Sequence, residues 1–286
     1  MQNKNQIIDK FTIDDLLHRS WVYKNSEAFF KFFNFIASFH HYSRYNTMLV
    51  YLQNEAVTFF GGKSFWRKRF GRGVKKDARP YIILAPMGPV MLVYDVMDTE
   101  GKESPEEFLH NGFGRNPFDV KGKLPKEMFD RAVEIAMSLG IKITFHETSI
   151  LKGGHITTIL KGDPEIVIST NGTIEMKFST LIHELAHLFL GHTGHSKLIK
   201  ENEKKVIKIL QRQLSRSAEE LEAETVSFLL SKKLGLETNA AEYIAAYIRN
   251  ENDLIEFSYE SVIKTADRID QLFKLSDFHF DIQQQS

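Results

Sequence analysis

Hydrophobic residues recur every three to four positions early in the chain, which is the spacing of one face of an α-helix. Residues 25–54 carry this pattern in aromatic and aliphatic side chains. Ser43 interrupts the pattern and is a favourable N-cap residue, so we expect two helices divided near that position. Further on, the short apolar runs at 81–86 and 90–96 predict two buried strands.

The pattern after residue 125 predicts a different order of elements. A helix should end at Gly140 and be followed by the strand "IKITFHE". The runs "HITTIL" and "EIVIST", separated by "KGDP", predict a hairpin with an edge strand. Helical patterns then surround His183 and recur near 216–235, 239–249 and 252–274. The whole order predicts an α+β fold.

A segment dense in Gly, Pro and Asn, residues 111–125, separates these two patterns. We therefore expect two domains, 1–118 and 119–286. The first should combine helices with a small sheet, and the second should be an α+β domain built around the helix that contains His183.

Composition limits the class of protein. The 286 residues are 42% hydrophobic and 26% charged, which is typical of a folded protein. The chain has no cysteine, so disulfides and cysteine-ligated zinc are excluded, and we expect a reducing compartment. Because no apolar run reaches transmembrane length and the N-terminal residues lack a signal-peptide core, we expect a cytoplasmic protein with no membrane partner.

Charge is distributed unevenly although the net charge is zero. Residues 1–90 carry 14 Lys and Arg against 6 Asp and Glu, whereas the other 196 residues carry 23 against 31. A basic first part and an acidic second part indicate different partners for the two halves.

The sequence "HELAH" at 183–187 has the spacing of a metal-binding helix. His183 and His187 are four residues apart, so on a helix they share one face and can bind one ion. Glu184 lies about 100° further around the helix and can reach a metal-coordinated water without being a ligand. This is the HExxH arrangement, in which the glutamate is the general base. The chance of this spacing arising at random here is about 3%.

The third ligand does not follow immediately. The metzincin spacing requires glycine and histidine at positions that are here Leu190 and Thr193. His192 and His195 are out of register, and we expect them to flank the helix end, where a cation complements the helix dipole.

A second helix, 216–230, offers the missing ligand, with Ser217 as its predicted N-cap. Glu220 and Glu224 are four residues apart and share a face. We predict Glu220 as the third ligand of a Zn²⁺ ion, in the gluzincin manner, and Glu224 as the acceptor that fixes the tautomer of a ligand histidine. Glu219 and Glu222 stay open as alternative ligands, although a solvated acidic face suits both.

Residues 63–79 form a basic and aromatic segment, expected to be a loop, with eight Lys or Arg against one Asp. Phe65, Trp66 and Phe70 alternate with these cations. Basic side chains neutralise phosphates and aromatic faces stack on unpaired bases, which favours single-strand binding. The alternative is a solvated basic loop with Trp66 in the core.

Two resemblances follow from these motifs. "HELAH" with "ELEAE", in which Glu220, Ala223 and Glu224 match, resembles the zincin-type metallopeptidases of the ImmA/IrrE kind. The stretch 42–86 is similar to the N-terminal domain of ArdC-type antirestriction proteins, although Asp77–Ala78 replaces a common Gly–Glu pair. The residues that match are Tyr42, Ser43, Asn46, Leu49, Gln53, Trp66, Gly71, Arg72, Val74, Lys75, Lys76, Ala85 and Pro86.

The resemblance implies a single-stranded-DNA-binding domain at 1–118 joined to a zinc metallopeptidase domain at 119–286 that acts on a peptide or protein substrate. It also implies a protein of a mobile genetic element that protects incoming DNA from restriction. The residues expected to contact DNA are Tyr42, Arg44, Asn46, Lys63, Trp66, Arg67, Lys68, Arg69, Arg72, Lys75 and Lys76.

Two alternatives remain open at this stage. One is a non-proteolytic protein that coats single-stranded DNA and uses the metal only structurally. The other is an ImmA-like peptidase that cleaves a repressor.

Overall fold

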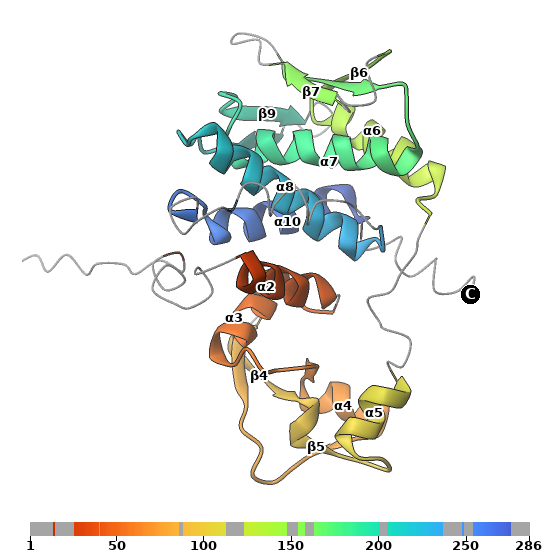
Figure 1. Cartoon of the computed structure of the whole chain (residues 1–286), viewed down its shortest axis with the longest axis vertical. Helices are drawn as coiled ribbons and strands as arrows, with labels where there is room; N and C mark the ends of the chain where they lie inside the picture. Colours follow the sequence, from red (N-terminus) through yellow and green to blue (C-terminus); the bar gives the residue numbers. More distant parts are fainter. Residues whose placement is uncertain are drawn as a thin grey trace, which may run out of the picture.

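The structure is a computed structural model with a mixed α+β fold, as the sequence predicts. A sheet lies at one end of the long axis, several helices lie in the middle, and a second sheet lies at the other end (Figure 1). The described residues are 14, 26–39, 41–85, 88–112, 123–147, 154–157, 163–200, 205–236, 248 and 254–275.

The sheet at the upper end of Figure 1 has the strand order β6-β8-β7. β6 (Lys142–His146) runs parallel to β8 (Glu165–Ser169), and β7 (Gly154–Thr157) runs antiparallel to it. The expected hairpin pairing is therefore confirmed, but β8 is the central strand and only β6 and β7 are edges. α6 (Lys126–Ser138) precedes this sheet, and Gly140 follows the helix with φ of 75°, as expected for its end.

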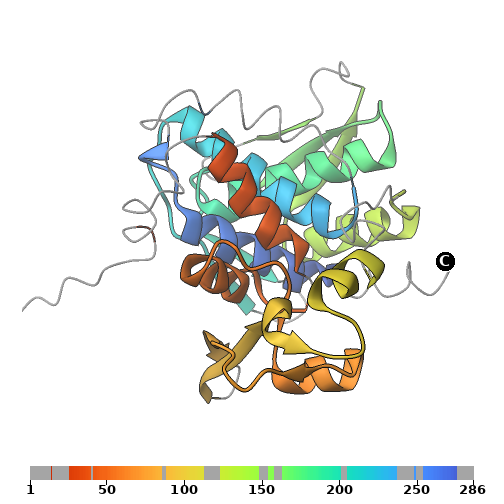
Figure 2. The ribbon, with the colours of Figure 1, turned by 60° about the horizontal axis from the view of Figure 1, so that its bottom comes forward.

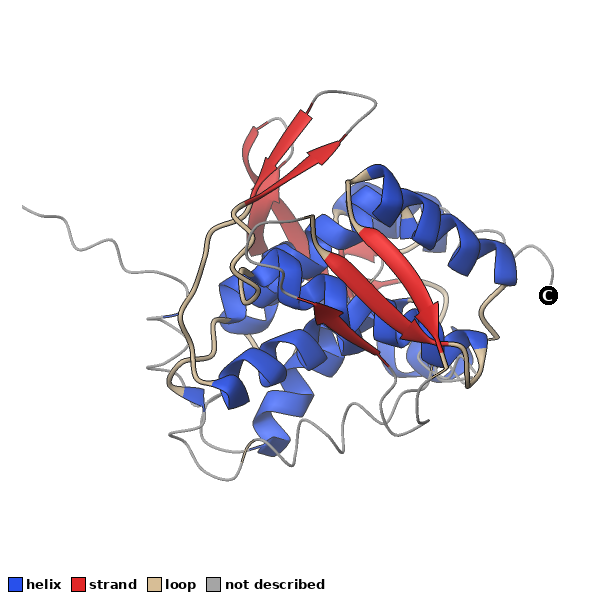
Figure 3. Cartoon of the chain, turned by 90° about the horizontal axis from the view of Figure 1, so that it is seen from above, coloured by secondary structure: helices blue, strands red, loops and turns tan. Residues whose placement is uncertain are grey.

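This sheet packs on α7 (Ile174–Leu190), as seen from above in Figure 3. Thr173 caps the helix by accepting a hydrogen bond from the backbone N–H of Met176. Gly191 ends it in the left-handed conformation, with φ of 83°. The opposite side of α7 packs mainly against α8, so these two helices meet inside the molecule.

α8 (Arg216–Lys233) begins one residue before the predicted cap. Ser215, not Ser217, accepts from the backbone N–H of Ala218, so the expected N-cap is wrong. α10 (Tyr259–Phe273) starts later than the expected residue 252, because Ser258 caps it by accepting from the backbone N–H of Ser261. The helix expected at 239–249 lies outside the described residues, apart from Ile248.

α2 (Ser26–Ser38) belongs to the same hydrophobic core as α7, α8 and α10. It packs against α8, and Figure 2 shows it crossing the other helices. Phe29 contacts the ring of Phe257 with centroids 5.2 Å apart, and Phe33 stacks on Tyr259 at 5.5 Å. One continuous core therefore joins the start and the end of the described chain. The expected boundary at 118 and 119 lies outside the described residues.

α3 (Arg44–Gln53) connects this core to the second sheet. Ser43 is its N-cap, as predicted. The sheet is antiparallel in the order β1-β4-β3, and α3 packs along β3. The strands are β1 (Phe60–Gly61), β3 (Tyr81–Ala85) and β4 (Gly88–Asp95).

The predicted burial of β3 and β4 holds for one face only. Ile83 and Val93 are fully buried in a second hydrophobic cluster. On the opposite face Ile82 is 51% exposed and Leu92, its partner in the register, is 44% exposed. The expectation of fully buried strands is therefore wrong, because this sheet is covered on one side.

The first part of the basic segment is a helix, α4 (Lys63–Phe70), where the sequence predicted a loop. Gly71 closes it with a positive φ of 62°, and its backbone N–H donates to Arg67 O and Trp66 O. The remaining elements are β2 (Gly73–Val74), η2 (Val96–Asp98), β5 (Thr99–Glu100), α5 (Pro105–Gly112), β9 (Lys197–Lys200) and β10 (Lys205–Lys208).

Candidate metal centre

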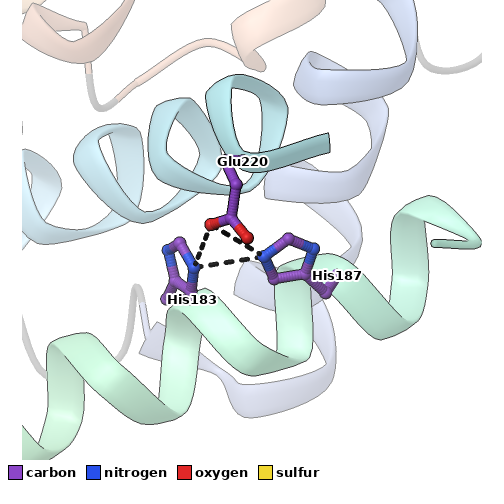
Figure 4. A group of neighbouring side chains, drawn as sticks. All are labelled: His183, His187 and Glu220. Carbon is purple, nitrogen blue, oxygen red and sulfur yellow. Dashed lines mark hydrogen bonds and ion pairs between the residues drawn. The ribbon is translucent and has the colours of Figure 1, made fainter. Parts of the chain in front are cut away.

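Three predicted ligands meet where α8 crosses α7. His183 and His187 project from one face of α7, and Glu220 of α8 points between them (Figure 4). The two Nε2 atoms are 3.1 Å apart, and Glu220 Oε2 lies 3.5 Å from His183 Nε2 and 3.6 Å from His187 Nε2. The structure therefore brings together side chains that are 33 to 37 positions apart in sequence.

These distances fit one tetrahedral cation. Zinc binds imidazole nitrogen and carboxylate oxygen at about 2.0–2.2 Å, which places tetrahedral ligand atoms about 3.3–3.6 Å from one another. The observed distances lie in or near that range. Two imidazoles and one carboxylate are also a donor set that zinc accepts while keeping a fourth position open.

Glu224 supports the first of these histidines. Its Oε2 lies 3.0 Å from His183 Nδ1, so a proton on that nitrogen is shared with the carboxylate and Nε2 is left to face Glu220. The sequence predicted this contact, because Glu224 lies four residues after Glu220 on α8 and shares its face.

The charges at the site favour a cation. Burial would lower the pKa of His183, but hydrogen bonds to Glu220 and Glu224 outweigh it and raise that pKa to about 10. The same contacts from His183 and His187 hold the pKa of the Glu220 carboxyl far below its usual range. A positive charge in this pocket is therefore stabilised by two carboxylates.

Glu184, the expected general base, is 7% exposed and occupies the next position along α7 after His183. Among the described residues, neither Glu219 nor Glu222 belongs to the metal-ligand group. The structure thus favours Glu220 over both alternative ligands.

His192 and Glu222 occupy positions that sequence reasoning missed. His192 was expected to flank the helix end, and Glu222 to be either an alternative ligand or part of a solvated acidic face. Instead, His192 Nδ1 lies 3.1 Å from His187 Nδ1, and Glu222 is 0% exposed. The solvated face expected for Glu222 is therefore wrong. His192 does flank the end of α7, as expected, but the turn at Gly191 folds it back against the helix. His195 does lie beyond the helix end, where its Nδ1 is 3.0 Å from Thr193 Oγ1.

Exposed cations line α4, the helical part of the segment expected to bind DNA. Lys63, Arg67, Lys68 and Arg69 are all exposed, and so is Lys76 further along the chain. A shallow hollow on the same helix is lined by Ser64, Phe65, Lys68, Arg69 and Phe70. Five of the eleven expected DNA contacts are therefore accessible cations.

Three other expected contacts are buried. Trp66 is 0% exposed, and its indole N–H donates to Tyr94 O at 3.1 Å. Arg72 donates to Thr99 Oγ1 at 2.8 Å, and Arg44 is held inside the molecule by two aspartates of α10. Direct contact of these three side chains with DNA is not supported, because their surfaces are covered by protein.

The last three expected contacts use their polar groups within the protein. Tyr42 Oη accepts from the backbone N–H of Gly62 at 3.1 Å. Lys75 Nζ donates to Met97 O at 2.8 Å, and the Asn46 amide bonds to the backbone of β3. The structure gives each of them a role in folding.

Comparisons of the chain with protein-family models, with curated proteins and with solved structures gave no match. Among the described helices, none combines the length and apolar character needed to cross a bilayer. The resemblances in sequence therefore remain predictions.

Proposed function

We propose that this chain is a zinc-dependent endopeptidase whose N-terminal part binds single-stranded DNA. The observation that carries the proposal is the convergence of His183, His187 and Glu220 at the mutual distances of tetrahedral ligands. The place of Glu184 in the same helix completes the HExxH arrangement. The sequence resemblance to ArdC-type proteins adds the protection of incoming DNA of a mobile genetic element.

Zinc bound by these three residues would act as a Lewis acid and lower the pKa of a coordinated water towards about 7. Glu184 would take the proton from the attacking water and deliver it to the leaving amine. Glu224 would keep the imidazole of His183 in the tautomer that presents Nε2 to the cation.

An extended peptide can be held by strand addition at the edge of a sheet. In this structure β7 is an edge strand that packs against α7, the helix that carries the two histidines. β8 is excluded as the docking strand because it pairs on both sides. β7 is therefore the strand along which we place the substrate.

The peptidase is tested with Glu184→Gln in the full chain and a mixture of unstructured peptides read by mass spectrometry. We expect the variant to keep its zinc and lose cleavage. Glu219→Gln, which removes the same charge outside the ligand group, is the matched control and should cleave normally. Cleavage by Glu184→Gln at the wild-type rate would overturn the mechanism.

The ligand set is tested by elemental analysis. Glu220→Ala should lose bound zinc, whereas Glu224→Ala should retain it with about 10- to 100-fold lower affinity, because it loses only the partner of a ligand. Full zinc occupancy in Glu220→Ala would show that Glu220 is not a zinc ligand.

A second candidate function is a non-proteolytic protein that coats single-stranded DNA, and the exposed cations of α4 favour it. The two functions differ in what Glu184→Gln does to the protection of DNA against a nuclease. Unchanged protection by the inactive variant supports the coating function, and lost protection supports the peptidase.

A further inference from the structure

A line of buried polar groups extends from the side of His187 that faces away from the candidate cation. His187 Nδ1 lies 3.1 Å from His192 Nδ1, and His192 Nε2 lies 3.2 Å from Glu222 Oε2. Glu222 is in turn held by both terminal nitrogens of Arg212, one of them 2.9 Å from Oε1. Four side chains therefore form one continuous chain of hydrogen bonds.

The proton positions in this chain follow from the ligand role of His187. A histidine that binds a cation through Nε2 carries its proton on Nδ1. His187 then donates, and His192 must accept at Nδ1 and carry its own proton on Nε2. That proton meets Glu222, which as a carboxylate can only accept. One direction of donation, from His187 to Glu222, satisfies all of these atoms.

Glu222 is a fully buried carboxylate, which is costly unless it is neutralised and hydrogen-bonded. Here Arg212 supplies the opposite charge, and the backbone N–H of Ser258 donates to Oε1 at 2.7 Å. Arg212 precedes α8 and Ser258 caps α10, so two separate elements fix the carboxylate.

The turn after α7 brings this support into place. Leu210 packs so closely on Gly191 that a β-carbon there would lie 2.0 Å from Leu210 O. The backbone N–H of Arg212 also donates to Gly191 O at 3.2 Å. The segment that carries Arg212 is thereby anchored at the end of the helix that carries His187, and glycine is needed at the turn.

We propose that His192, Glu222 and Arg212 are positioning residues that fix the ring and the tautomer of His187 for cation binding. The proposal rests on the proposed function only in that His187 is a ligand. His183 reaches a carboxylate directly through Glu224, whereas His187 reaches one through a second imidazole. The two ligand histidines are thus oriented by different hydrogen-bonding arrangements.

The test compares two replacements of His192 in the full chain. His192→Gln can accept from His187 with its amide oxygen and donate to Glu222 with its amide nitrogen, so it should bind zinc within a few-fold of the wild type. His192→Phe keeps a ring of similar size without polar atoms. It should lose zinc affinity about 10- to 100-fold, as removal of a ligand's partner does. Cobalt(II) spectra should change in the phenylalanine variant alone.

Two outcomes would overturn the proposal. One is wild-type zinc affinity and an unaltered cobalt spectrum in His192→Phe. The other is an equal loss in both variants, which would mean that only the shape of the imidazole matters. Because zinc and cobalt binding are the readouts, neither outcome depends on peptidase activity. If the proposed ligand set is itself wrong, a separate measurement shows it, because Glu220→Ala would then keep its full amount of zinc.

Glu222 gives an independent check if His192→Phe does not fold. Glu222→Gln should lower zinc affinity, and it should leave the charge of Arg212 inside the protein without a counter-charge. The pair Glu222→Gln with Arg212→Met removes both charges and should restore the unfolding midpoint in EDTA while zinc binding stays weak. Zinc affinity equal to the wild type in this folded double variant would contradict the role of Glu222.

Discussion

The side-chain amide of Asn46 binds the backbone of Leu84 as a neighbouring strand would. Its Nδ2 donates to Leu84 O at 3.0 Å, and its Oδ1 accepts from Leu84 N at 2.9 Å. Gln53, two turns further along α3, makes the same pair of bonds with Ile82 at 2.8 and 2.9 Å. Two amides of one helix therefore satisfy the free edge of β3, which protects it from pairing with another chain.

Replacing Asn46 with alanine should destabilise the protein without weakening its affinity for DNA. Two neutral hydrogen bonds are lost, and water can reach the partly exposed site, so we expect a loss of about 1–2 kcal/mol in the free energy of unfolding. Urea denaturation measures it. Glu55→Ala, which removes only an exposed ion pair with Lys31, is the control and should cost less than about 1 kcal/mol. Unchanged stability together with weaker DNA binding would show that Asn46 contacts DNA, as the sequence predicted.

Lys68→Ala should weaken binding to single-stranded DNA and flatten its salt dependence. Each phosphate contact on a single strand contributes about 0.7 to the slope of log affinity against log salt concentration. Loss of one contact should therefore lower the slope by about that amount, measured by fluorescence anisotropy at several salt concentrations. Lys126→Ala, an exposed lysine of α6, should leave the slope unchanged. Equal effects of the two variants would show that α4 has no special part in binding.

Arg44→Met should destabilise the fold strongly. The guanidinium of Arg44 lies 2.8 Å from Asp267 and 3.1 Å from Asp270, and Asp270 is buried. Removing one partner of a buried pair leaves an uncompensated charge and costs about 3–5 kcal/mol. Lys233 also contacts Asp270, so the loss should fall at the lower end of that range. A loss below 1 kcal/mol in urea denaturation would show that the pair contributes little.

Acid should reveal the same cluster. Burial alone would raise the pKa of Asp270, but Arg44 and Lys233 outweigh it and hold that pKa below 3.8. The ionised carboxylate therefore stabilises the folded state above pH 3.8, and this contribution is lost as pH falls through the lower folded value. Arg44→Met raises the folded pKa, so its acid unfolding should begin at higher pH than that of the wild type. Coincident acid transitions of the two proteins would exclude Asp270 as the group responsible.

Zinc binding should release a proton from His183. The metal-free ring has a pKa of about 10, raised from 6.5, so it is protonated at neutral pH, whereas a ligand nitrogen must be free. Zinc affinity should rise about tenfold per pH unit between pH 7 and 9. Calorimetry in buffers of different ionisation enthalpy counts the protons. Binding enthalpies that do not depend on the buffer would contradict this protonation state.

The stability of the metal-free protein should fall as pH rises, whereas zinc affinity increases. A folded pKa above the unfolded one means that the protonated ring stabilises the fold fully below pH 6.5. That stabilisation is lost as pH rises through about 10. Unfolding in EDTA across this window measures it.

Local signals made part of the fold predictable. Ser43 was recognised as a cap because capping depends on the residue itself and on the three that follow it. Ser215 was missed for the same reason, because Ser217 is an equally good local candidate and only the backbone geometry separates them. α4 was missed because its hydrophobic stripe is short. Its stability comes from the burial of Trp66, whose ring contacts Phe59 and whose indole N–H donates to Tyr94 O.

The candidate site was predictable where spacing on one helix was sufficient. His183 and His187, and likewise Glu220 and Glu224, are each one turn apart. The contact between His192 and Glu222 has no such local signal, because it depends on the turn at Gly191 and on the packing of α8 against α7. Whether a polar residue on such a helix face is buried, and which group it binds, can be predicted only when the element that packs against that face is known.

The aromatic contacts between α2 and the start of α10 set a condition on synthesis. A ribosome adds Phe29 and Phe33 more than 200 residues before it adds Phe257 and Tyr259. Until then, the apolar face of α2 lacks these two aromatic partners, and contacts this distant in sequence form late. α8, which carries Glu220, packs against both α2 and α10. We expect the pocket for the cation to close only after the ribosome has added α10.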